Sequence, residues 1–266
     1  MHGRPNVILS PHLDDAVLSL GGLIAREPER SSVVTFFAGR PAPAARGRWD
    51  WLCGFRDSDE ALECRIAENR RALRLLGVGA ARVRDLGHLD RQYRRAGEPA
   101  EAEATRGRVA SELARLLRDH AGHQADIFAP AMELHADHAL LKQALLAEAA
   151  AGSPSPGVRF HLYQDMPYSY LFLRARSVRP LPSLDFSKIK RLVPPLARAA
   201  TVPIDLSEAD MERKLAALAA YASQLRGSPG YWLRLLRDFA RYEARFHGRM
   251  AAYVEVVHEL SPGMRA

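Results

Sequence analysis

The chain has 266 residues, of which 47% are hydrophobic and 26% are charged. This length and composition fit a globular enzyme with one large α/β domain or two small ones. The sequence shows no signal-peptide pattern and no run of ~18 apolar residues, so secretion and stable membrane insertion are not expected.

The net charge is +7, but only four of the 38 basic residues are lysines, and the arginines are scattered through helical segments. The charge alone would suit a nucleic-acid partner, but no motif supports one, so no nucleic-acid partner is expected. An anionic substrate or an acidic carrier explains the positive charge equally well. The two cysteines, Cys53 and Cys64, are too few for a disulfide framework or a thiolate zinc site. We therefore expect reduced thiols in a cytoplasmic protein, whose oligomeric state the sequence does not indicate.

Strand and helix patterns alternate from residue 6 to residue 164. Short buried-type runs such as NVILS predict strands, and longer amphipathic runs predict helices. In chain order we expect a strand at 6–10, a helix at 16–26, a strand at 32–37, a helix at 59–76, a strand at 81–86, a helix at 105–120, a strand at 126–129, a helix at 136–149 and a strand at 158–164. This alternation predicts a doubly wound, mostly parallel sheet with right-handed crossovers.

Two regions interrupt that pattern. Residues 40–57 are too rich in Pro, Gly and Arg for regular structure and are long for a connection, so they are a candidate substrate loop. Further turns are expected at four prolines, Pro180, Pro182, Pro194 and Pro195. Ser207 and Asp210 form a capping-box pattern that opens a helix to about Arg226, and 231–246 reads as the last long helix. We expect residues 1–266 to form a single Rossmann-like α/β domain with C-terminal helices.

Two polar clusters follow two of the expected strands. His12, Asp14 and Asp15 come after the first strand, and Glu133-Leu-His135-Ala-Asp137-His138 follows the strand at 126–129. Ligands of open α/β sheets bind beyond the carboxyl ends of the strands, so the two clusters are expected to converge. Imidazole and carboxylate are zinc ligands, and a catalytic zinc uses three protein ligands and water. The two clusters thus offer two histidines and Asp15 as ligands, and leave Asp14 to accept a proton from the water.

Each cluster also has a structural interpretation. Asp14 or Asp15 is a possible cap of the helix that follows, and Asp137 of the helix at 136–149. Gly21-Gly22 is explained by close packing of its helix.

The sequence Pro11-His12-Leu13-Asp14-Asp15, together with His135-Ala-Asp137-His138, resembles the PIG-L/LmbE family of zinc-dependent N-deacetylases. The resemblance covers roughly residues 5–250. Supporting matches are Trp49-Asp50, Cys53-Gly54-Phe55, Arg65 with Glu68, Asp90 with Tyr93-Arg94, Tyr163 with Asp165-Met-Pro167, and Lys214 with Tyr221 and Gln224. The chain departs from many members at Leu13 and Ala16, where they have proline and glutamate.

The resemblance implies one zinc ion per chain, held by His12, Asp15 and His138. It implies that Asp14 is the general base and that His135 supports the tetrahedral intermediate. Asp137 would orient a histidine, a role that fixes the tautomer of a metal ligand.

Four further residues are expected to contact substrate. Arg65 matches an arginine near substrate hydroxyls, although a salt bridge with Glu68 explains it as well. Asp90 is also expected to contact substrate, because it belongs to the supporting match of Asp90 with Tyr93-Arg94. Trp49, with Trp51 in the same loop, is placed to stack on a sugar ring or to pack at the site mouth. Glu133 lies just before the second motif, in the stretch where some relatives carry a tyrosine. It is expected to contact the substrate amine or to brace the metal site.

These residues predict a zinc-dependent hydrolase that removes an N-acetyl group from a small amino sugar or glycoconjugate. One alternative is an HD-type metal phosphohydrolase, but its ligands come from helices and include a His-Asp pair in the opposite order to Asp137-His138. Another is a non-catalytic, metal-containing carbohydrate-binding protein, which would have no use for Asp14 and His135.

Overall fold

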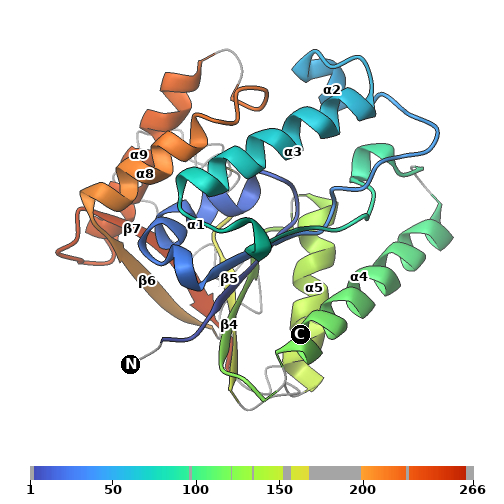
Figure 1. Ribbon diagram of the computed structural model, residues 1–266. Helices are drawn as coiled ribbons and strands as arrows, with labels where there is room; N and C mark the ends of the chain where they lie inside the picture. Colours follow the sequence, from blue (N-terminus) through green and yellow to red (C-terminus); the bar gives the residue numbers. More distant parts are fainter. Residues whose placement is uncertain are drawn as a thin grey trace, which may run out of the picture.

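The computed structural model describes residues 3–95, 98–120, 122–133, 135–151, 157–167, 199–225 and 228–261. Its strands form one sheet in the order β3-β2-β1-β4-β5-β7-β6 (Figure 1). They are β1 (Asn6–Ser10), β2 (Ser31–Thr35), β3 (Val83–Asp85), β4 (Ala125–Pro130), β5 (Val158–Tyr163), β6 (Ala200–Leu206) and β7 (Tyr253–Glu259). Strands β1 to β5 pair in parallel, whereas β7 runs antiparallel to β5 and β6. The predicted mostly parallel α/β sheet is confirmed.

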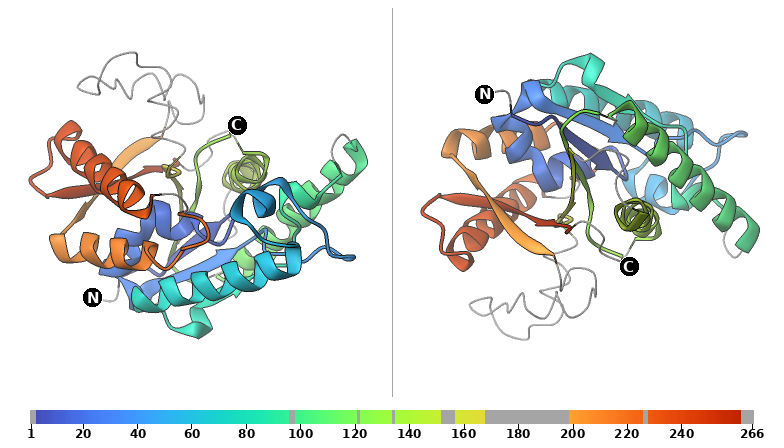
Figure 2. Two further views of the ribbon diagram at one scale, coloured as in Figure 1. Left: turned by 90° about the horizontal axis from the view of Figure 1, so that it is seen from above. Right: turned by 90° about the horizontal axis from the view of Figure 1, so that it is seen from below.

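Helices cover both faces of this sheet, as the doubly wound prediction required. One face is covered by α1 (Asp15–Arg26), α3 (Ser58–Leu75), α8 (Glu208–Leu218) and α9 (Pro229–Phe246). The other face is covered by α4 (Pro99–Asp119) and α5 (Ala136–Ala151). Figure 2 shows the orange and red C-terminal helices beside the blue α1, away from the green α4 and α5. A short helix, α2 (Arg48–Cys53), lies between β2 and α3, and single 3-10 turns occupy Pro28–Arg30, Ala80–Arg82 and Arg91–Tyr93.

Strand β1 shows why the core forms two layers. All five of its residues are buried, because a central parallel strand has helices on both sides. Successive side chains of a strand point to opposite faces. Ile8 accordingly joins the cluster under α1, whereas Val7 and Leu9 join the cluster under α4 and α5.

The two glycines of α1 allow close packing, as expected from the sequence. A Cβ atom at Gly22 would lie 2.3 Å from Leu206 Cδ1, and one at Gly21 would lie 2.9 Å from Lys214 Cγ. The helix is interrupted at Leu20, which has non-helical dihedral angles. The Glu255 carboxylate accepts hydrogen bonds from the backbone N–H groups of Gly22 and Leu23 at 2.8 and 2.9 Å. It thereby caps the second half of α1 from the neighbouring strand β7.

Several expected boundaries were wrong. Residues 40–57 contain α2, whose first turn is stabilised by the Asp50 carboxylate accepting from Gly47 N at 2.9 Å. Strands β6 and β7 were not expected from the sequence. Helix α8 ends at Leu218 instead of near Arg226, and α4 begins at Pro99, before residue 105. The turns expected at Pro180, Pro182, Pro194 and Pro195 lie outside the described residues.

The strand order reverses direction at β1, which lies between β2 and β4. At such a switch point the loops that leave neighbouring strands diverge and open a crevice at the carboxyl ends. The loops after β1 and β4 are the ones that carry the two polar clusters.

None of the described helices has the length and apolar character needed to cross a membrane. The cytoplasmic location and the single-domain organisation of residues 1–266 stay predictions.

Candidate active site

Local hydrogen bonds shape the turn between β1 and α1. Ser10 Oγ donates to the carbonyl oxygen of His12 at 2.6 Å and accepts from Ala16 N at 3.0 Å. Asp15 Oδ2 accepts from the backbone N–H of His12 at 2.8 Å. Asp14 occupies the N-cap position, but its side chain makes no capping hydrogen bond. The capping interpretation of Asp14 is therefore wrong, and its carboxylate faces the cavity described below.

Asp137 lies in the first turn of α5 and is fully buried. Its Oδ2 atom lies 3.1 Å from His12 Nε2 and accepts from Arg91 N at 2.9 Å. Its other oxygen accepts from the Arg94 guanidinium. Burial raises the pKa of Asp137, but the contacts with His12 and Arg94 outweigh burial and lower it. Asp137 is thus an ionised carboxylate in contact with the Nε2 side of the His12 ring, and its orienting role stays a prediction.

His138, in the same turn of α5, is held in a similar way. Its Nδ1 atom lies 2.5 Å from Asp165 Oδ1, and its Nε2 atom lies 3.2 Å from Asp15 Oδ2. The second oxygen of Asp165 accepts from the backbone N–H groups of Ala131 and Met132, both at 2.8 Å. Burial lowers the pKa of His138, but the Asp15 and Asp165 carboxylates outweigh it and raise the pKa to about 10.

His12 completes the cluster. Its Nδ1 atom lies 3.1 Å from Asp15 Oδ2. Burial lowers its pKa, but Asp90, Asp137 and Asp15 together raise the pKa well above its usual value. Buried carboxylates and imidazoles gathered in this way are found paired with one another or bound to a metal ion.

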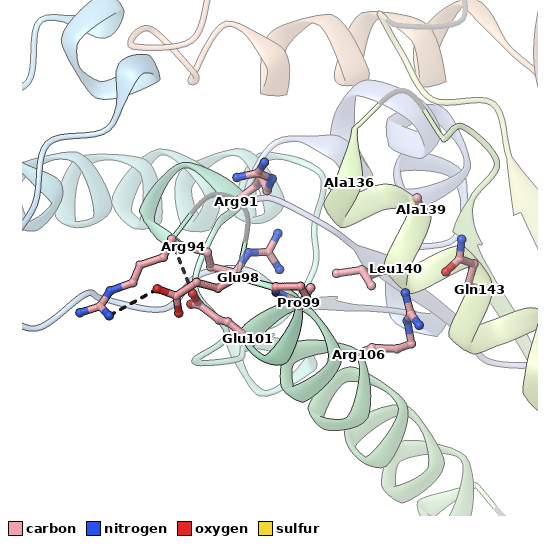
Figure 3. A pocket seen from close by; sticks show the side chains of 12 residues that line it. Arg91, Arg94, Glu98, Pro99, Glu101, Arg106, Ala136, Ala139, Leu140 and Gln143 are labelled. Atoms are coloured by element: carbon pink, nitrogen blue, oxygen red, sulfur yellow. Dashed lines mark hydrogen bonds and ion pairs between the residues drawn. The ribbon is translucent and has the colours of Figure 1, made fainter.

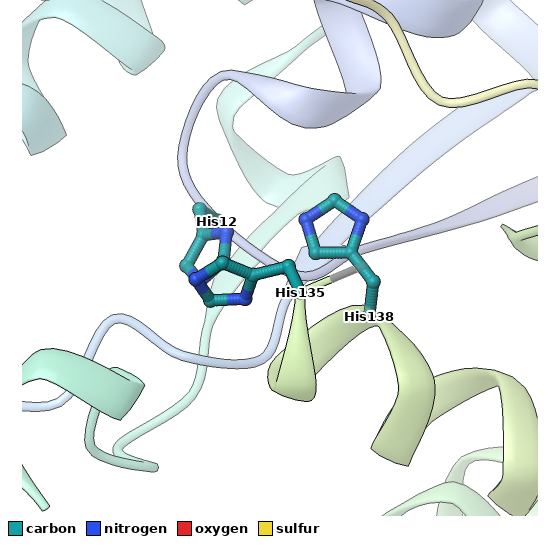
Figure 4. A group of neighbouring side chains, drawn as sticks. All are labelled: His12, His135 and His138. Atoms are coloured by element: carbon teal, nitrogen blue, oxygen red, sulfur yellow. The ribbon is translucent and has the colours of Figure 1, made fainter. Parts of the chain in front are cut away.

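In two sets of residues, each residue offers one donor atom and all the donor atoms of the set lie within 4.8 Å of one another. The first set is His12, His135 and His138, and the second is His12, Asp90, His135 and Asp137. Figure 4 shows the first set, with the His12 and His135 rings close together and His138 projecting from α5. Asp15 belongs to neither set, although its Oδ2 atom contacts both His12 and His138. The donor types fit zinc, and the choice of ligands stays a prediction.

A cavity of about 520 Å³ opens onto this cluster. Its lining residues are His12, Asp14, Asp15, Leu18, Trp49, Arg65, Asp90, Arg91, Gln92, His135, Pro167, Gln224, Leu225, Trp232 and Leu236. Three of the four expected substrate residues, Trp49, Arg65 and Asp90, are in this lining. Glu133 is not, because its carboxylate is largely exposed and pairs with the buried Lys142 Nζ at 2.8 Å. Trp51 is 63% exposed and is also absent from the lining.

Arg65 lies between two carboxylates of the cavity. It is 3.7 Å from Asp14 and 3.9 Å from Asp90. Glu68, its alternative partner, instead accepts from the backbone N and Oγ of Ser223 at 2.7 and 2.6 Å. Burial and the neighbouring Asp15 raise the pKa of Asp14, while Arg65 opposes the shift. A carboxylate with a raised pKa is a stronger base, which suits the role expected for Asp14.

His135 lies at the cavity surface in front of α5. Its ring centroid is 4.8 Å from that of His12, and burial, with the charge of His12, lowers its pKa. The ring is therefore neutral near pH 7 and available as a hydrogen-bond donor to a ligand.

Two residues that hold the cluster, Asp165 and Arg94, were expected only as supporting matches and not as site residues. Asp165 follows β5, the parallel neighbour of β4, so a third polar position at a strand end was a usable signal. Arg94 belonged to a supporting match, but its contact with Asp137 was not predictable because it joins segments 43 positions apart.

A second cavity, of about 410 Å³, lies between the 3-10 turn at Arg91 and the first turns of α4 and α5 (Figure 3). Arg91 lines both cavities. Arg94 and Arg95 line only the second, where Arg95 pairs with Glu98 at 3.5 Å. Arg94, which also packs over the Phe37 ring at 5.4 Å, thus separates this cavity from Asp137.

Known proteins match this chain at several levels. The family model for PIG-L, GlcNAc-PI de-N-acetylase, matches residues 7–149. The 2'-N-acetylparomamine deacetylase of Streptomyces fradiae is 30% identical over 202 residues, which are 69% of this chain and 67% of that protein.

Solved structures extend the similarity over nearly the whole chain. The antimicrobial reagent A40926 pseudoaglycone deacetylase is 26% identical, with a TM-score of 0.69 and coverage of 98% of this chain and 99% of that one. The zinc-inhibited form of teicoplanin deacetylase is 22% identical, with a TM-score of 0.72 and coverage of 97% and 98%, and supports the fold alone. Family model, relative and fold agree, and the chain belongs to the PIG-L family of de-N-acetylases.

Proposed function

We propose that this chain hydrolyses the N-acetyl group of an amino-sugar-containing substrate with a zinc ion held by His12, Asp15 and His138. The observation that carries the proposal is the position of Asp15 Oδ2, 3.1 Å from His12 Nδ1 and 3.2 Å from His138 Nε2. Donors that share a tetrahedral zinc at ~2.0–2.1 Å are about 3.3 Å apart, and these two separations are close to that value. Zinc at this point would supply Lewis acidity to the amide carbonyl and lower the pKa of water.

Asp137 and Asp165 orient the two histidines. Each carboxylate holds the ring nitrogen that faces away from Asp15, namely Nε2 of His12 and Nδ1 of His138. These contacts favour a proton on the outer nitrogen, so the inner nitrogen is the one that would give up its proton to bind the metal. The same contacts restrain the planes of the two rings.

Asp14 is assigned as the general base. Its carboxylate lines the cavity beside Asp15, and burial raises its pKa toward the range in which a base works best near neutral pH. It takes a proton from the attacking water and, once protonated, is able to deliver that proton to the leaving amine.

His135 is assigned to the oxyanion that forms from the amide carbonyl. Its lowered pKa keeps the ring neutral, so it acts as an N–H donor to the developing charge. Arg65 and Asp90, 3.9 Å apart in the same lining, are assigned to substrate hydroxyl groups.

The substrate class is supported by the relatives, because the Streptomyces fradiae relative is a 2'-N-acetylparomamine deacetylase. An HD-type phosphohydrolase is disfavoured, since His12 follows a strand and not a helix. A non-catalytic binding protein does not explain why Asp14 and His135 face the cavity.

The test is acetate release from a panel of N-acetylglucosamine conjugates by the zinc-loaded protein. We expect turnover that is lost on treatment with a chelator and restored by zinc, with one zinc per chain by elemental analysis. Retention of full turnover after the metal is removed would refute the zinc assignment.

A further inference from the structure

The active-site cavity carries a second group of lining residues that the proposed chemistry does not use. We call these six residues the apolar wall: Leu18, Trp49, Pro167, Leu225, Trp232 and Leu236. They come from α1, α2, the segment after β5, the segment after α8, and α9. Trp232 and Leu236 are four residues apart, so they lie on one face of α9. Leu18 and Leu236 also belong to the main hydrophobic core, which gives the wall a fixed base.

The Trp49 side chain is held at this wall by its polar atoms. Its Nε1 donates to Gln224 Oε1 at 2.7 Å, and its backbone N donates to Gln92 Oε1 at 3.1 Å. Gln92 in turn donates to Asp50 in the first turn of α2. Because the indole N–H is already paired, the rest of the Trp49 ring offers only apolar surface to a ligand.

The polar groups beside the wall are the amides of Gln92 and Gln224, whose Oε1 atoms already accept hydrogen bonds from Trp49. By the metal cluster we mean the candidate zinc-binding residues and the carboxylates in contact with them, namely His12, Asp15, Asp90, His135, Asp137, His138 and Asp165. The titratable groups that line the cavity, including His12, Asp14 and Asp90, belong to or surround this cluster. A volume of about 520 Å³ lies in the range that takes a drug-sized ligand and exceeds the needs of one sugar ring. Hydroxyl or ammonium groups placed against the apolar wall would lose water without gaining partners, whereas an apolar group placed there would gain from burial.

We propose that the amino-sugar substrate carries an apolar aglycone, aromatic or alkyl, which packs against the apolar wall while the acetamido group lies at the metal cluster. This inference rests on the proposed deacetylation and narrows its substrate class to amphipathic glycoconjugates. A substrate without an apolar aglycone would leave the wall without a ligand group.

The experiment compares kcat/KM of the zinc-loaded protein for the methyl, phenyl and octyl glycosides of N-acetylglucosamine. We expect the phenyl and octyl glycosides to exceed the methyl glycoside by about tenfold or more, since their aglycones bury apolar surface. A third arm uses the methyl glycoside of N-octanoylglucosamine. If only the longer acyl chain raises kcat/KM, the wall serves the acyl group and the aglycone proposal is overturned.

The Trp232→Ala variant tests the assignment to the wall. We expect the octyl-to-methyl ratio of kcat/KM to fall at least fivefold toward one, and Trp49→Ala to lower the same ratio if Trp232→Ala fails to fold. Trp51→Ala is the matched control, because Trp51 lies on α2 but outside the cavity lining, and it should keep the parental ratio.

Binding is measured separately, by calorimetric titration of Asp14→Asn protein with the same glycosides. Tighter binding of the octyl glycoside than of the methyl glycoside supports the wall even if no glycoside is deacetylated, a result that would refute only the proposed reaction. Equal binding and equal kcat/KM for all three glycosides would overturn the inference while leaving deacetylation intact.

Discussion

The metal cluster and the apolar wall face the same cavity but are built differently. The cluster residues His12, Asp15 and Asp137 follow β1 and β4 and lie within residues 7–149, the part that the family model matches. Most of the apolar wall, including Leu225, Trp232 and Leu236, lies after residue 149. The cluster is fixed by buried hydrogen bonds to backbone and carboxylate groups, whereas the wall is fixed by packing except at Trp49, which two hydrogen bonds hold. We infer that the proposed reacting groups lie mainly in the first part of the chain, whereas both parts contribute residues that would contact the substrate.

Substitutions in the cluster should therefore change kcat or metal affinity, and substitutions in the wall should change discrimination between substrates. The largest effect is expected at Asp14. Asp14→Asn removes the proposed base and should lower kcat by about a thousandfold, equivalent to about 4 kcal/mol, with zinc content unchanged. Steady-state kinetics and elemental analysis on the same sample check both statements. Parental turnover in the variant would show that another group is the base.

The pH profile of the parent protein sharpens this prediction. Because burial raises the pKa of Asp14, the base is lost by protonation as pH falls through a value above that of a free aspartate, ~3.9. We expect kcat/KM to fall on the acid side at that raised value, and the residual activity of Asp14→Asn to lack this limb. An acid limb that is identical in the variant would assign the titration to a different group.

The next largest effect is expected at Asp165, which fixes the His138 ring through Nδ1 at 2.5 Å. Asp165→Asn should weaken zinc binding by 10- to 100-fold, the usual result of losing a carboxylate behind a histidine ligand. Competition with a chelator measures the affinity. Asp126→Asn is the control, because Asp126 is a carboxylate of β4 that pairs with Arg159 at 2.6 Å outside the cavity lining. A zinc affinity lowered equally in both variants would attribute the loss to general destabilisation.

A smaller effect is expected at Arg94, which acts on the metal cluster through Asp137. Arg94→Met keeps much of the packing over Phe37 but leaves Asp137 with His12 and the backbone of Arg91 as partners. We expect kcat to fall about tenfold, with partial rescue by Arg94→Lys, as a weakened positioning contact predicts. Arg95→Met is the matched control, since Arg95 is exposed and pairs only at the surface. If both variants lose activity equally, the contact with Asp137 has no special role.

The cluster was far more predictable from sequence than the wall, for a physical reason. His12, Asp14 and Asp15 are neighbours in the chain, and the ends of parallel strands gather such groups at one edge of the sheet. Trp232 and Leu236 carry no such marker, because an aromatic residue and a leucine on an amphipathic helix are normal core residues. Their position at the cavity depends on how α9 packs onto the sheet beside β7, and both β6 and β7 were missed. Glu133 shows the reverse error, since its place in the motif suggested a site role but Lys142 holds it outside the cavity.

The smallest effect is expected at Trp49, where the two parts of the cavity meet. Trp49→Phe keeps an aromatic ring but removes the hydrogen bond from Nε1 to Gln224 Oε1, a contact worth about 1 kcal/mol or less at this half-exposed position. KM for a phenyl glycoside should rise up to about fivefold while kcat stays within twofold, since no group of the metal cluster touches the indole N–H. Trp51→Phe, on the same short helix, should change neither constant. A loss of kcat in Trp49→Phe would show that the wall also positions the reacting amide, and the division of the cavity into a reacting part and a selecting part would not hold.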